Sequence, residues 1–487
     1  MENTLYYGDN LDIMRRYIPD NSIDLVYLDP PFKSDQSYNI LFKEKNGTES
    51  VAQIKIFEDT WHWDQRAEET FVEITEKAPK KVADLIIALR NFLGSNDMMA
   101  YLVMMAIRLV ELYRVLKDTG SIYLHCDPTA SHYLKLVMDA VSGVKSFRNE
   151  VVWLYTRPGT KHQKQFPRVH DIILWYSKSD NWIFNPDAVR IPYSQKTIER
   201  GKYSVATSKV TKGIHERVLP YGGKCPEDWW HIPMIQGNAR ERLGYPTQKP
   251  ETLLERILKA SSNEGNIVLD PFCGCGTTIT VAEKLKRKWI GIDVTHLAIS
   301  LMRHRLKDAF GDKLKFDVIG EPVDLRGAET LAKQDPYQFQ WWALGLVGAR
   351  PAESEQKKGK DKGIDGYIYF YDETQKTKKI IIQVKGGAVN PGYIRDLKGT
   401  MERSNAQIGV FITLKPPTKG MKEEAGISGF YKSPGWNKNY PKLQILTIEE
   451  LLQGKNIDYP PKTSVTFKKA EKHKEKTHKQ LKLDDRD

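Results

Sequence analysis

The residues best suited to chemistry are four consecutive ones, Asp29, Pro30, Pro31 and Phe32. They follow an apolar run, residues 23–28, whose length and composition predict a buried strand. Because each proline lacks an N–H and fixes φ, the strand must end at Asp29 and continue as a stiff turn. The turn combines a carboxylate, an unpaired proline carbonyl and an aromatic ring. Such groups accept hydrogen bonds from an amino group and stack on a flat ring, which is how enzymes hold an extruded nucleobase.

A second group of candidate residues lies much later in the chain. Residues 266–270 predict a strand, and Gly274 and Gly276 predict a tight turn into a helix. Glycines let a ligand approach the backbone closely, and the start of a helix offers free N–H groups to a carboxylate. The next predicted strand ends in Asp293, where doubly wound sheets bind ribose hydroxyls. This unit fits an adenosine ligand with a charged tail, and the same physical argument allows a dinucleotide.

A third group lies in a predicted hairpin near the C-terminal end. Side chains alternate along a strand, so Gln383 and Lys385 share one face, and Asp365 on the preceding strand is aimed at the same place. Metal-assisted phosphodiester cleavage needs oxygen ligands for Mg²⁺ and a lysine that orients or deprotonates water. We therefore expect Asp365 and Gln383 to bind Mg²⁺ beside Lys385. Because Gln383 is uncharged, Glu353 or Glu355 would have to complete the site, or the module only binds DNA.

The elements around these residues predict an α/β protein. Helix, tight turn and buried strand recur, which is typical of a doubly wound, Rossmann-like sheet. We expect this domain over residues 1–325, with a basic insert at about 182–242 that reads DNA through cations and aromatic rings. A smaller α/β domain is expected over 326–455 and a basic, disordered tail over 456–487. His125 ends a predicted strand and is expected to be an ordinary core-edge histidine.

Charge and cysteine content limit the function classes. The net charge is +12, and the chain from Arg326 onward has 30 Lys and Arg against 20 Asp and Glu. A basic module beside a nearly neutral one predicts a polyanionic partner such as double-stranded DNA. The four cysteines lack paired metal-ligand spacing, so we expect reduced thiols and a cytoplasmic protein. No apolar run is long enough to span a membrane. A homodimer or helper subunits are both compatible with the sequence.

Two of the three groups resemble the motifs of one enzyme family. Asp29-Pro-Pro-Phe32 is similar to the catalytic motif of amino-group DNA methyltransferases, which make N6-methyladenine or N4-methylcytosine. The sequence Asp270-Pro-Phe-Cys-Gly-Cys-Gly-Thr-Thr278, with Tyr-Pro-Thr-Gln-Lys-Pro upstream, is similar to the S-adenosyl-L-methionine site of these enzymes. The catalytic turn precedes the cofactor loop, which is the order of the β group. The resemblance covers about residues 1–322.

The resemblance implies a role for each motif residue. Asp29 and the Pro30 carbonyl would accept the hydrogens of the target amino group, within the turn that Pro31 completes, and Phe32 would stack on the flipped base. Asp at the first position, where Ser is typical of the cytosine enzymes, favours adenine N6 over cytosine N4. The residues implied for the cofactor are Asp9, Lys249, Asp270, Phe272, Gly274, Gly276, Thr277 and Asp293.

The C-terminal group resembles the Mrr-like branch of the PD-(D/E)xK nucleases, in which Asp and Gln-x-Lys occupy the places of Asp365, Gln383 and Lys385. This resemblance implies a Mg²⁺-dependent endonuclease, and hence restriction and modification in one chain. One alternative is a methyltransferase whose second module only binds DNA. Another is a methyltransferase for RNA or protein amides, against which the large basic insert argues.

Overall fold

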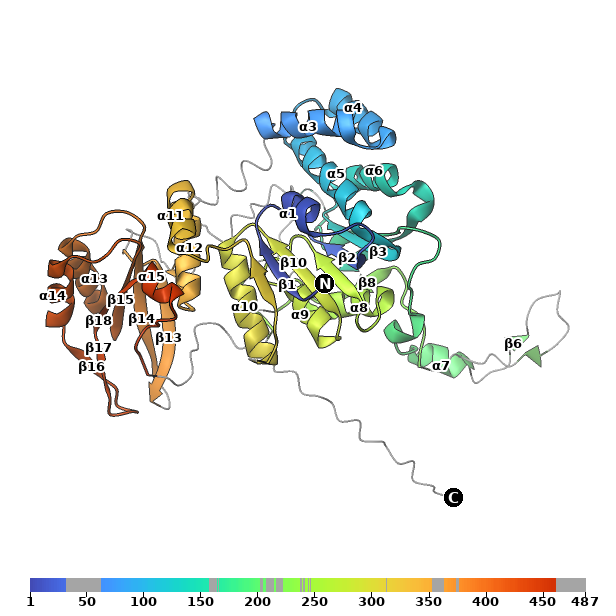
Figure 1. Cartoon of the computed structure of the whole chain (residues 1–487). Helices are drawn as coiled ribbons and strands as arrows, with labels where there is room; N and C mark the ends of the chain where they lie inside the picture. Colours follow the sequence, from blue (N-terminus) through green and yellow to red (C-terminus); the bar gives the residue numbers. More distant parts are fainter. Residues whose placement is uncertain are drawn as a thin grey trace, which may run out of the picture.

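The computed structural model describes residues 1–31, 63–156, 164, 166–201, 205–206, 214–215, 222–236, 239, 241–243, 245, 247–311, 313–352, 363–373 and 376–460. They form two main sheets, one of nine strands and one of five, and two small two-stranded sheets. Figure 1 shows the main sheets in separate bodies, with helices α11 (Leu325–Gln334) and α12 (Pro336–Leu346) between them. Within these ranges, no helix has both the length and the apolar character needed to cross a bilayer.

The nine-stranded sheet confirms the predicted doubly wound architecture. Its strand order is β11-β1-β10-β9-β2-β3-β5-β4-β8. The strands from β11 to β3 pair in parallel, whereas β5 runs antiparallel to β3 and β4. The strands are β1 (Thr4–Tyr7), β2 (Ile23–Leu28), β3 (Leu116–Cys126), β4 (Phe147–Leu154), β5 (His170–Ser177), β8 (Trp229–His231), β9 (Ile267–Asp270), β10 (Lys288–Asp293) and β11 (Asp317–Ile319).

Two strands that are far apart in the sequence are neighbours at the centre of this sheet. Leu25 pairs with Val268 and Val26 pairs with Leu269, in parallel. Both strands therefore end at the same edge of the sheet, which brings the turn after β2 next to the glycine loop after β9. From β9 the chain continues to β10, and from β2 it continues to β3, so the two connections run in opposite directions along the strand order. Such a switch point is where doubly wound sheets bind their ligands.

Helices cover both faces of the nine-stranded sheet and divide its buried residues into two cores. Val26 and Leu28 pack with α1, α4, α5 and α6, while Leu25 and Tyr27 pack with α8, α9 and α10. This alternation is expected of a strand that is buried on both faces. The helices are α1 (Asn10–Tyr17), α3 (Gln65–Lys77), α4 (Lys80–Leu93), α5 (Asp97–Val115), α6 (Ser131–Ser142), α8 (Glu251–Ser261), α9 (Thr277–Lys284) and α10 (His296–Phe310).

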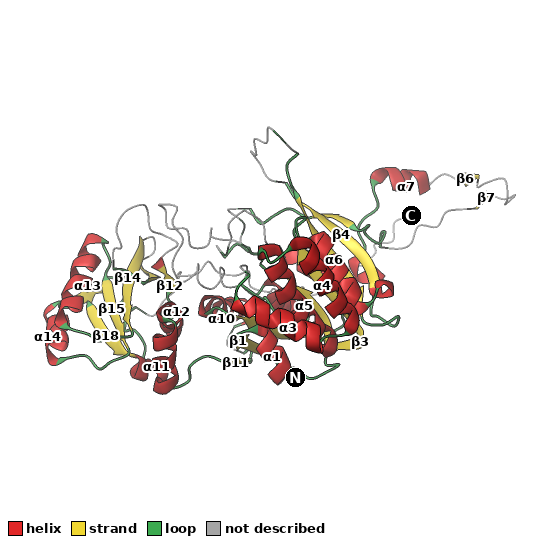
Figure 2. Ribbon diagram, turned by 90° about the horizontal axis from the view of Figure 1, so that it is seen from above, coloured by secondary structure: helices red, strands yellow, loops and turns green. Residues whose placement is uncertain are grey.

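The five-stranded sheet lies within the residues expected to form the smaller α/β domain. Its order is β12-β13-β14-β15-β18, with an antiparallel pair β13–β14 and parallel pairs from β14 to β18. Figure 2 shows α13 and α14 on one face of this sheet and α11 and α12 on the other. The elements are β12 (Arg350–Pro351), β13 (Gly366–Glu373), β14 (Lys376–Lys385), α13 (Pro391–Arg403), β15 (Ile408–Thr413), α14 (Lys419–Ile427), β16 (Phe430–Lys432), β17 (Asn439–Pro441), β18 (Leu443–Thr447) and α15 (Ile448–Leu452).

The two basic segments are described only in part. Within the insert, the described elements are α7 (Gln195–Gly201), β6 (Val205–Ala206) and β7 (Ile214–His215), besides β8. Two residues that were expected in the tail pack on the second module: Ile457 is buried in the core of its sheet, and the Tyr459 ring lies 5.8 Å from the Phe370 ring. Residues 461–487 lie outside the described part.

Candidate active site

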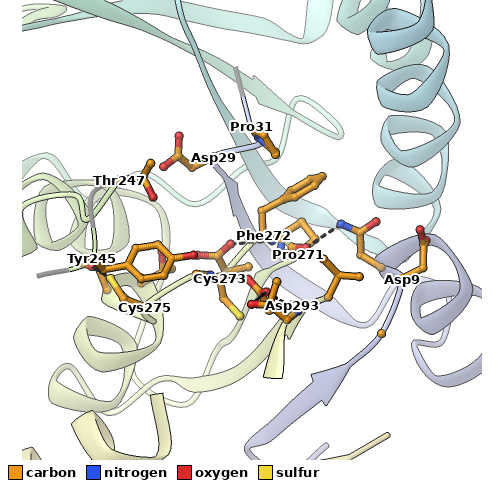
Figure 3. A pocket seen from close by; sticks show the side chains of 18 of the residues that line it. Asp9, Asp29, Pro31, Tyr245, Thr247, Pro271, Phe272, Cys273, Cys275 and Asp293 are labelled. Atoms are coloured by element: carbon orange, nitrogen blue, oxygen red, sulfur yellow. Dashed lines mark hydrogen bonds between the residues drawn. The ribbon is translucent and has the colours of Figure 1, made fainter. Parts of the chain in front are cut away.

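A cavity of about 590 Å³ lies where β2 and β9 end. The turn after β2 and the loop after β9 both line it. Figure 3 shows Asp29 and Pro31 on one side of Phe272 and Asp293 on the other. The expected site residues that line this cavity are Asp9, Asp29, Pro31, Lys249, Asp270, Phe272, Gly274, Thr277 and Asp293. Residues of both sequence motifs therefore line the same cavity, and the role of each residue stays a prediction.

Three expected residues depart from this pattern. Gly276 does not line the cavity, because a Cβ built on it would point at Met302, 2.6 Å from its Cγ. Gly276 has φ of +72° and serves as the N-cap of α9, so its turn geometry accounts for the glycine there. Pro30 is buried and is also absent from the lining. Phe32 lies outside the described residues.

The Asp29 carboxylate presents one satisfied and one unsatisfied oxygen. Its Oδ2 forms an ion pair with the Lys249 ammonium, so the structure joins Lys249, which was expected to contact the cofactor, to the turn after β2. Its Oδ1 is buried and has no hydrogen-bond partner in the part of the chain that the structure describes. A buried polar oxygen without a partner is costly. The Oδ1 atom is therefore well placed to accept a hydrogen bond from a ligand in the cavity.

A buried hydrogen-bonded chain lies behind Asp29. The His125 side chain is fully buried, with Nδ1 2.9 Å from the Tyr27 hydroxyl and Nε2 3.2 Å from Asp171 Oδ2. The Tyr155 hydroxyl donates to Asp171 Oδ1 at 3.1 Å. Burial raises the pKa of Asp171, but interactions with His125, Lys249 and Tyr155 together bring it below the ordinary value. His125 Nδ1 is 3.9 Å from Asp29 Oδ1. His125 was expected to be an ordinary core-edge histidine, and its partner Asp171, supplied by β5, was not predicted.

Asp270 and Asp293 are the last residues of β9 and β10, next to the glycine loop. Asp293 accepts hydrogen bonds from the N–H groups of Gly274 and Thr295, each at 2.9 Å, and burial raises its pKa. Burial raises the pKa of Asp270 to about 7, and the nearby charges of Asp29 and Asp293 add to this effect. The loop is therefore held by Asp293, and Asp270 takes up a proton near neutral pH.

The raised pKa of Asp270 predicts a pH-dependent stability that Asp270→Asn removes. The folded protein retains a proton that an unfolded aspartate with pKa 3.8 releases, so the free energy of unfolding falls as the pH rises from about 4 to about 7. Asparagine does not ionise, so the variant should lose less stability than the wild type across that window. Thermal denaturation without cofactor, at several pH values, measures the difference. Identical pH dependence in both proteins would contradict it.

Arg108 connects the start of the chain to the glycine loop. Its guanidinium donates to Asp9 Oδ2 at 2.8 Å and to Asn10 Oδ1 at 2.6 Å, and Asn10 Nδ2 donates to the Pro271 carbonyl at 2.7 Å. Asp9 also caps α1 by accepting the N–H of Leu11. Sequence reasoning missed Arg108. The only sequence signal for it was that Arg108 is a single charged residue within the apolar stretch of α5.

Arg305 holds the C-terminal end of the glycine loop. It too was not predicted from the sequence. It is 2% exposed and donates to the Cys275 carbonyl at 3.0 Å, to Thr277 Oγ1 at 3.1 Å and to Glu251 Oε1 at 2.9 Å. The buried ion pair ties the start of α9 to the start of α8. Thr277 thus lines the cavity while its hydroxyl is held from behind.

The described C-terminal candidate residues, Asp365, Gln383 and Lys385, come close together. Asp365 Oδ2 accepts the N–H of Val384 at 2.7 Å, and the Gln383 amide donates to the Gly363 carbonyl. Lys385 Nζ lies 5.5 Å from the centre of the Tyr393 ring. Among the residues described, no group of three or more His, Cys, Asp or Glu is arranged to hold a metal ion. Glu353 and Glu355 lie outside the described ranges. Gln383 Oε1 is buried without a hydrogen-bond partner among the described residues, so this part of the chain offers Asp365 and Gln383 as oxygen donors but no group of three acids for Mg²⁺.

Comparisons with known proteins give two family matches. Residues 23–302 match the N6/N4 methyltransferase family, described as DNA methylase. Residues 340–453 match a family described as NACHT-associated inactive restriction endonuclease 1. A restriction-endonuclease likeness therefore holds for the second module, but an inactive family does not support the Mg²⁺-dependent cleavage expected from the sequence.

Individual relatives agree with the first match. The chain is 30% identical to the type II methyltransferase M.HpaI of Haemophilus parainfluenzae over 278 residues, which are 56% of this chain and 79% of that protein. It is 27% identical to the DNA adenine methyltransferase YhdJ of Escherichia coli K12 over 304 residues, 62% and 82% of the two chains. The chain also resembles the solved structure of a putative DNA modification methylase from Thermus thermophilus, complexed with S-adenosyl-L-methionine. The two are 15% identical with a TM-score of 0.37, over 66% of this chain and 99% of that one.

Proposed function

Because the chain belongs to the N6/N4 DNA methylase family, we propose that it transfers a methyl group from S-adenosyl-L-methionine to N6 of an adenine flipped out of double-stranded DNA. One observation carries the proposal: the unsatisfied Oδ1 of Asp29 and the glycine loop at Gly274 belong to the same cavity. One part of that cavity suits an amino-group substrate and the other suits a nucleoside cofactor.

The cavity residues suit S-adenosyl-L-methionine. Asp293, held by the N–H groups of Gly274 and Thr295, would accept hydrogen bonds from the ribose hydroxyls. Asp293 also gives the cavity an acidic group that would complement a sulfonium cation. When bound, the cofactor supplies an electrophilic methyl group. Gly274 has φ of +49° and no side chain, which lets the ligand lie against the loop backbone.

The Asp29 turn would orient the target amino group. Asp29 Oδ1 and the Pro30 carbonyl would each accept one amino hydrogen, which directs the nitrogen lone pair at the methyl group. Holding the two reacting atoms in line supplies much of the rate enhancement, because the entropy of alignment is lost on binding rather than in the reaction. The nitrogen loses one proton as it gains the methyl group, and Asp29 is the nearest base to receive it. His125 and Asp171 would position Tyr27 and the turn from behind.

Adenine is favoured over cytosine by two observations. The first residue of the turn is Asp29, where Ser is typical of the cytosine enzymes. The DNA adenine methyltransferase YhdJ is similar to this chain over 62% of its length. N4-methylation of cytosine is the alternative.

Analysis of the methylated product tests the proposal. The full-length protein, labelled S-adenosyl-L-methionine and unmethylated duplex DNA are incubated together, and the DNA is digested to nucleosides for mass spectrometry. Label in N6-methyladenine is the expected result. Label in N4-methylcytosine would overturn the choice of base. Label in RNA or protein, with none in DNA, would overturn the DNA substrate.

For the second module we propose DNA contact without cleavage, with Mg²⁺-dependent cutting as the alternative that the hairpin residues suggested. The carboxylate of Asp365 already accepts a backbone N–H, and Gln383 replaces a charged ligand. Unmethylated plasmid incubated with the full chain and Mg²⁺ is therefore expected to stay intact on a gel. Cutting by the wild type that disappears in Lys385→Ala would support the nuclease instead.

A further inference from the structure

Part of the cavity wall lies outside the methylase match. Asp335, Pro336 and Tyr337 line the cavity together with Asp293 and Val294. The match to the methylase family ends at residue 302. The cavity is thus completed by the junction of α11 and α12, which neither family match includes in full.

Helix α12 belongs to the core of the second module. Phe339, Trp342 and Leu344 are buried in the same cluster as Ile380 and Ile382 of β14. Figure 1 shows α12 between this sheet and α10 of the methylase sheet. A change in the position of the second module would therefore move α12.

The same helix is also fixed to the methylase sheet. Buried Gln338 accepts the backbone N–H of His296, the first residue of α10, at 3.1 Å. The His296 ring stacks on Tyr7 of β1, with centroids 3.6 Å apart. Farther along, Gly345 lies so close to Ser300 that an added Cβ would be 3.0 Å from its Oγ. These contacts hold α12 against α10 along its length, and so keep its first residues at the cavity.

Tyr337 is placed for ligand contact rather than for packing. Asp335 caps α12 by accepting hydrogen bonds from the N–H groups of Tyr337 and Gln338, each at 3.0 Å. This cap fixes the backbone position of Tyr337. Its neighbours Gln338 and Phe339 are buried, whereas Tyr337 is 37% exposed. An aromatic ring in the same wall as the acid proposed to bind ribose is suited to stack on a purine.

We propose that the second module completes the cofactor site: Tyr337 packs on the adenine ring of S-adenosyl-L-methionine, and cofactor binding and the docking of α12 on α10 stabilise each other. The inference rests on the proposed function. Such coupling is reciprocal, so anything that loosens α12 weakens cofactor binding, and the cofactor tightens α12 by the same free energy. The restriction-endonuclease-like module would then act as a part of the methylase that responds to its cofactor.

Substitution of Tyr337 in the full-length protein tests the contact. Tyr337→Ala is expected to weaken S-adenosyl-L-methionine binding roughly tenfold in calorimetry, equivalent to one stacking contact of about 1.4 kcal/mol. Tyr337→Phe should bind like the wild type, because the ring and not the hydroxyl makes the contact. In methyl transfer, KM for the cofactor should rise while kcat stays unchanged. Tyr371→Ala, a control at an equally exposed tyrosine of β13, should change nothing.

The outcomes separate the two proposals. If the wild type does not bind S-adenosyl-L-methionine, the proposed function fails. If the wild type binds and Tyr337→Ala binds equally well, only the stacking contact is overturned. Adenosine as a competitor adds a further readout, because its affinity should fall with that of the cofactor if Tyr337 touches the adenine.

The coupling is tested away from the cavity. Gly345→Ala forces a methyl group against Ser300 and should weaken cofactor binding, whereas the double variant Gly345→Ala with Ser300→Gly removes the obstructing side chain and should restore it. Hydrogen exchange of α12 in the wild type should slow when S-adenosyl-L-methionine is added. Unchanged exchange in α12 at saturating cofactor, or cofactor affinity that is unaffected in the single variant while α12 exchanges faster, would overturn the coupling.

Discussion

Replacing Asp29 with alanine is expected to reduce methyl transfer to DNA on the order of 10³-fold, a loss typical of removing one preorganised group from an active site. The carboxylate is held at the end of a buried strand by the Lys249 ion pair, with Oδ1 left without a partner among the described residues. Alanine removes both oxygens, so only the Pro30 carbonyl would remain to orient the amino group and no carboxylate of the turn would receive its proton. Single-turnover transfer from labelled S-adenosyl-L-methionine to duplex DNA measures the loss.

Binding of the cofactor separates this effect from misfolding. S-Adenosyl-L-methionine should bind Asp29→Ala nearly as well as the wild type, because the ribose and methionine contacts proposed for it come from the glycine loop and Asp293. Asp29→Asn keeps one acceptor oxygen and should retain more activity than Asp29→Ala. Asp180→Ala removes an aspartate whose side chain is 94% exposed and should behave as the wild type. Full activity in Asp29→Ala would contradict the role assigned to the turn.

The sequence predicted the core of this arrangement because its motifs encode backbone geometry. Two prolines end β2 at a defined residue, and glycines with positive φ shape the turn after β9. Both signals are local, so no tertiary information is needed to recognise them. Their convergence then follows from the parallel pairing of β2 with β9, the switch point that the predicted doubly wound order implies.

The supporting residues were not predictable in the same way. Arg108 and Arg305 each lie on a helix, and which loop they contact depends on how that helix packs on the sheet. His125 acquires its partner only because β5 returns antiparallel to β3 and brings Asp171 to the same edge. A single sequence indicates that a charge is unusual at such a position, but not which group compensates it.

The second module illustrates a different limit. Strand alternation correctly predicted that Ile380, Ile382 and Val384 share one side of β14 and that Gln383 lies on the other. Alternation does not indicate whether an oxygen atom is free to bind a metal. Asp365 Oδ2 accepts a backbone N–H of the same hairpin, and the described residues place no group of three His, Cys, Asp or Glu side chains there.

Replacing Gly274 with valine is expected to abolish measurable binding of S-adenosyl-L-methionine. Gly274 has φ of +49°, and a Cβ there would lie 3.3 Å from the Tyr245 ring, before the two further methyl groups of valine are added. These atoms would occupy the space against the loop that the proposed cofactor would need, and Tyr245 lines the same cavity. The N–H of Gly274 also holds Asp293. Calorimetry with the cofactor alone measures the loss.

The backbone cost of such a substitution has to be separated from its effect on the cavity. Gly265 provides the control, because its φ is +80° and nothing lies within 4 Å of an added Cβ. Gly265→Val and Gly274→Val both force a branched side chain into the left-handed region, at about 1–2 kcal/mol or more of stability. Both should therefore melt at lower temperature, but only Gly274→Val should lose the cofactor. Equal loss of cofactor binding in the two variants would mean that general destabilisation explains it, and normal binding in Gly274→Val would exclude the loop from the cofactor site.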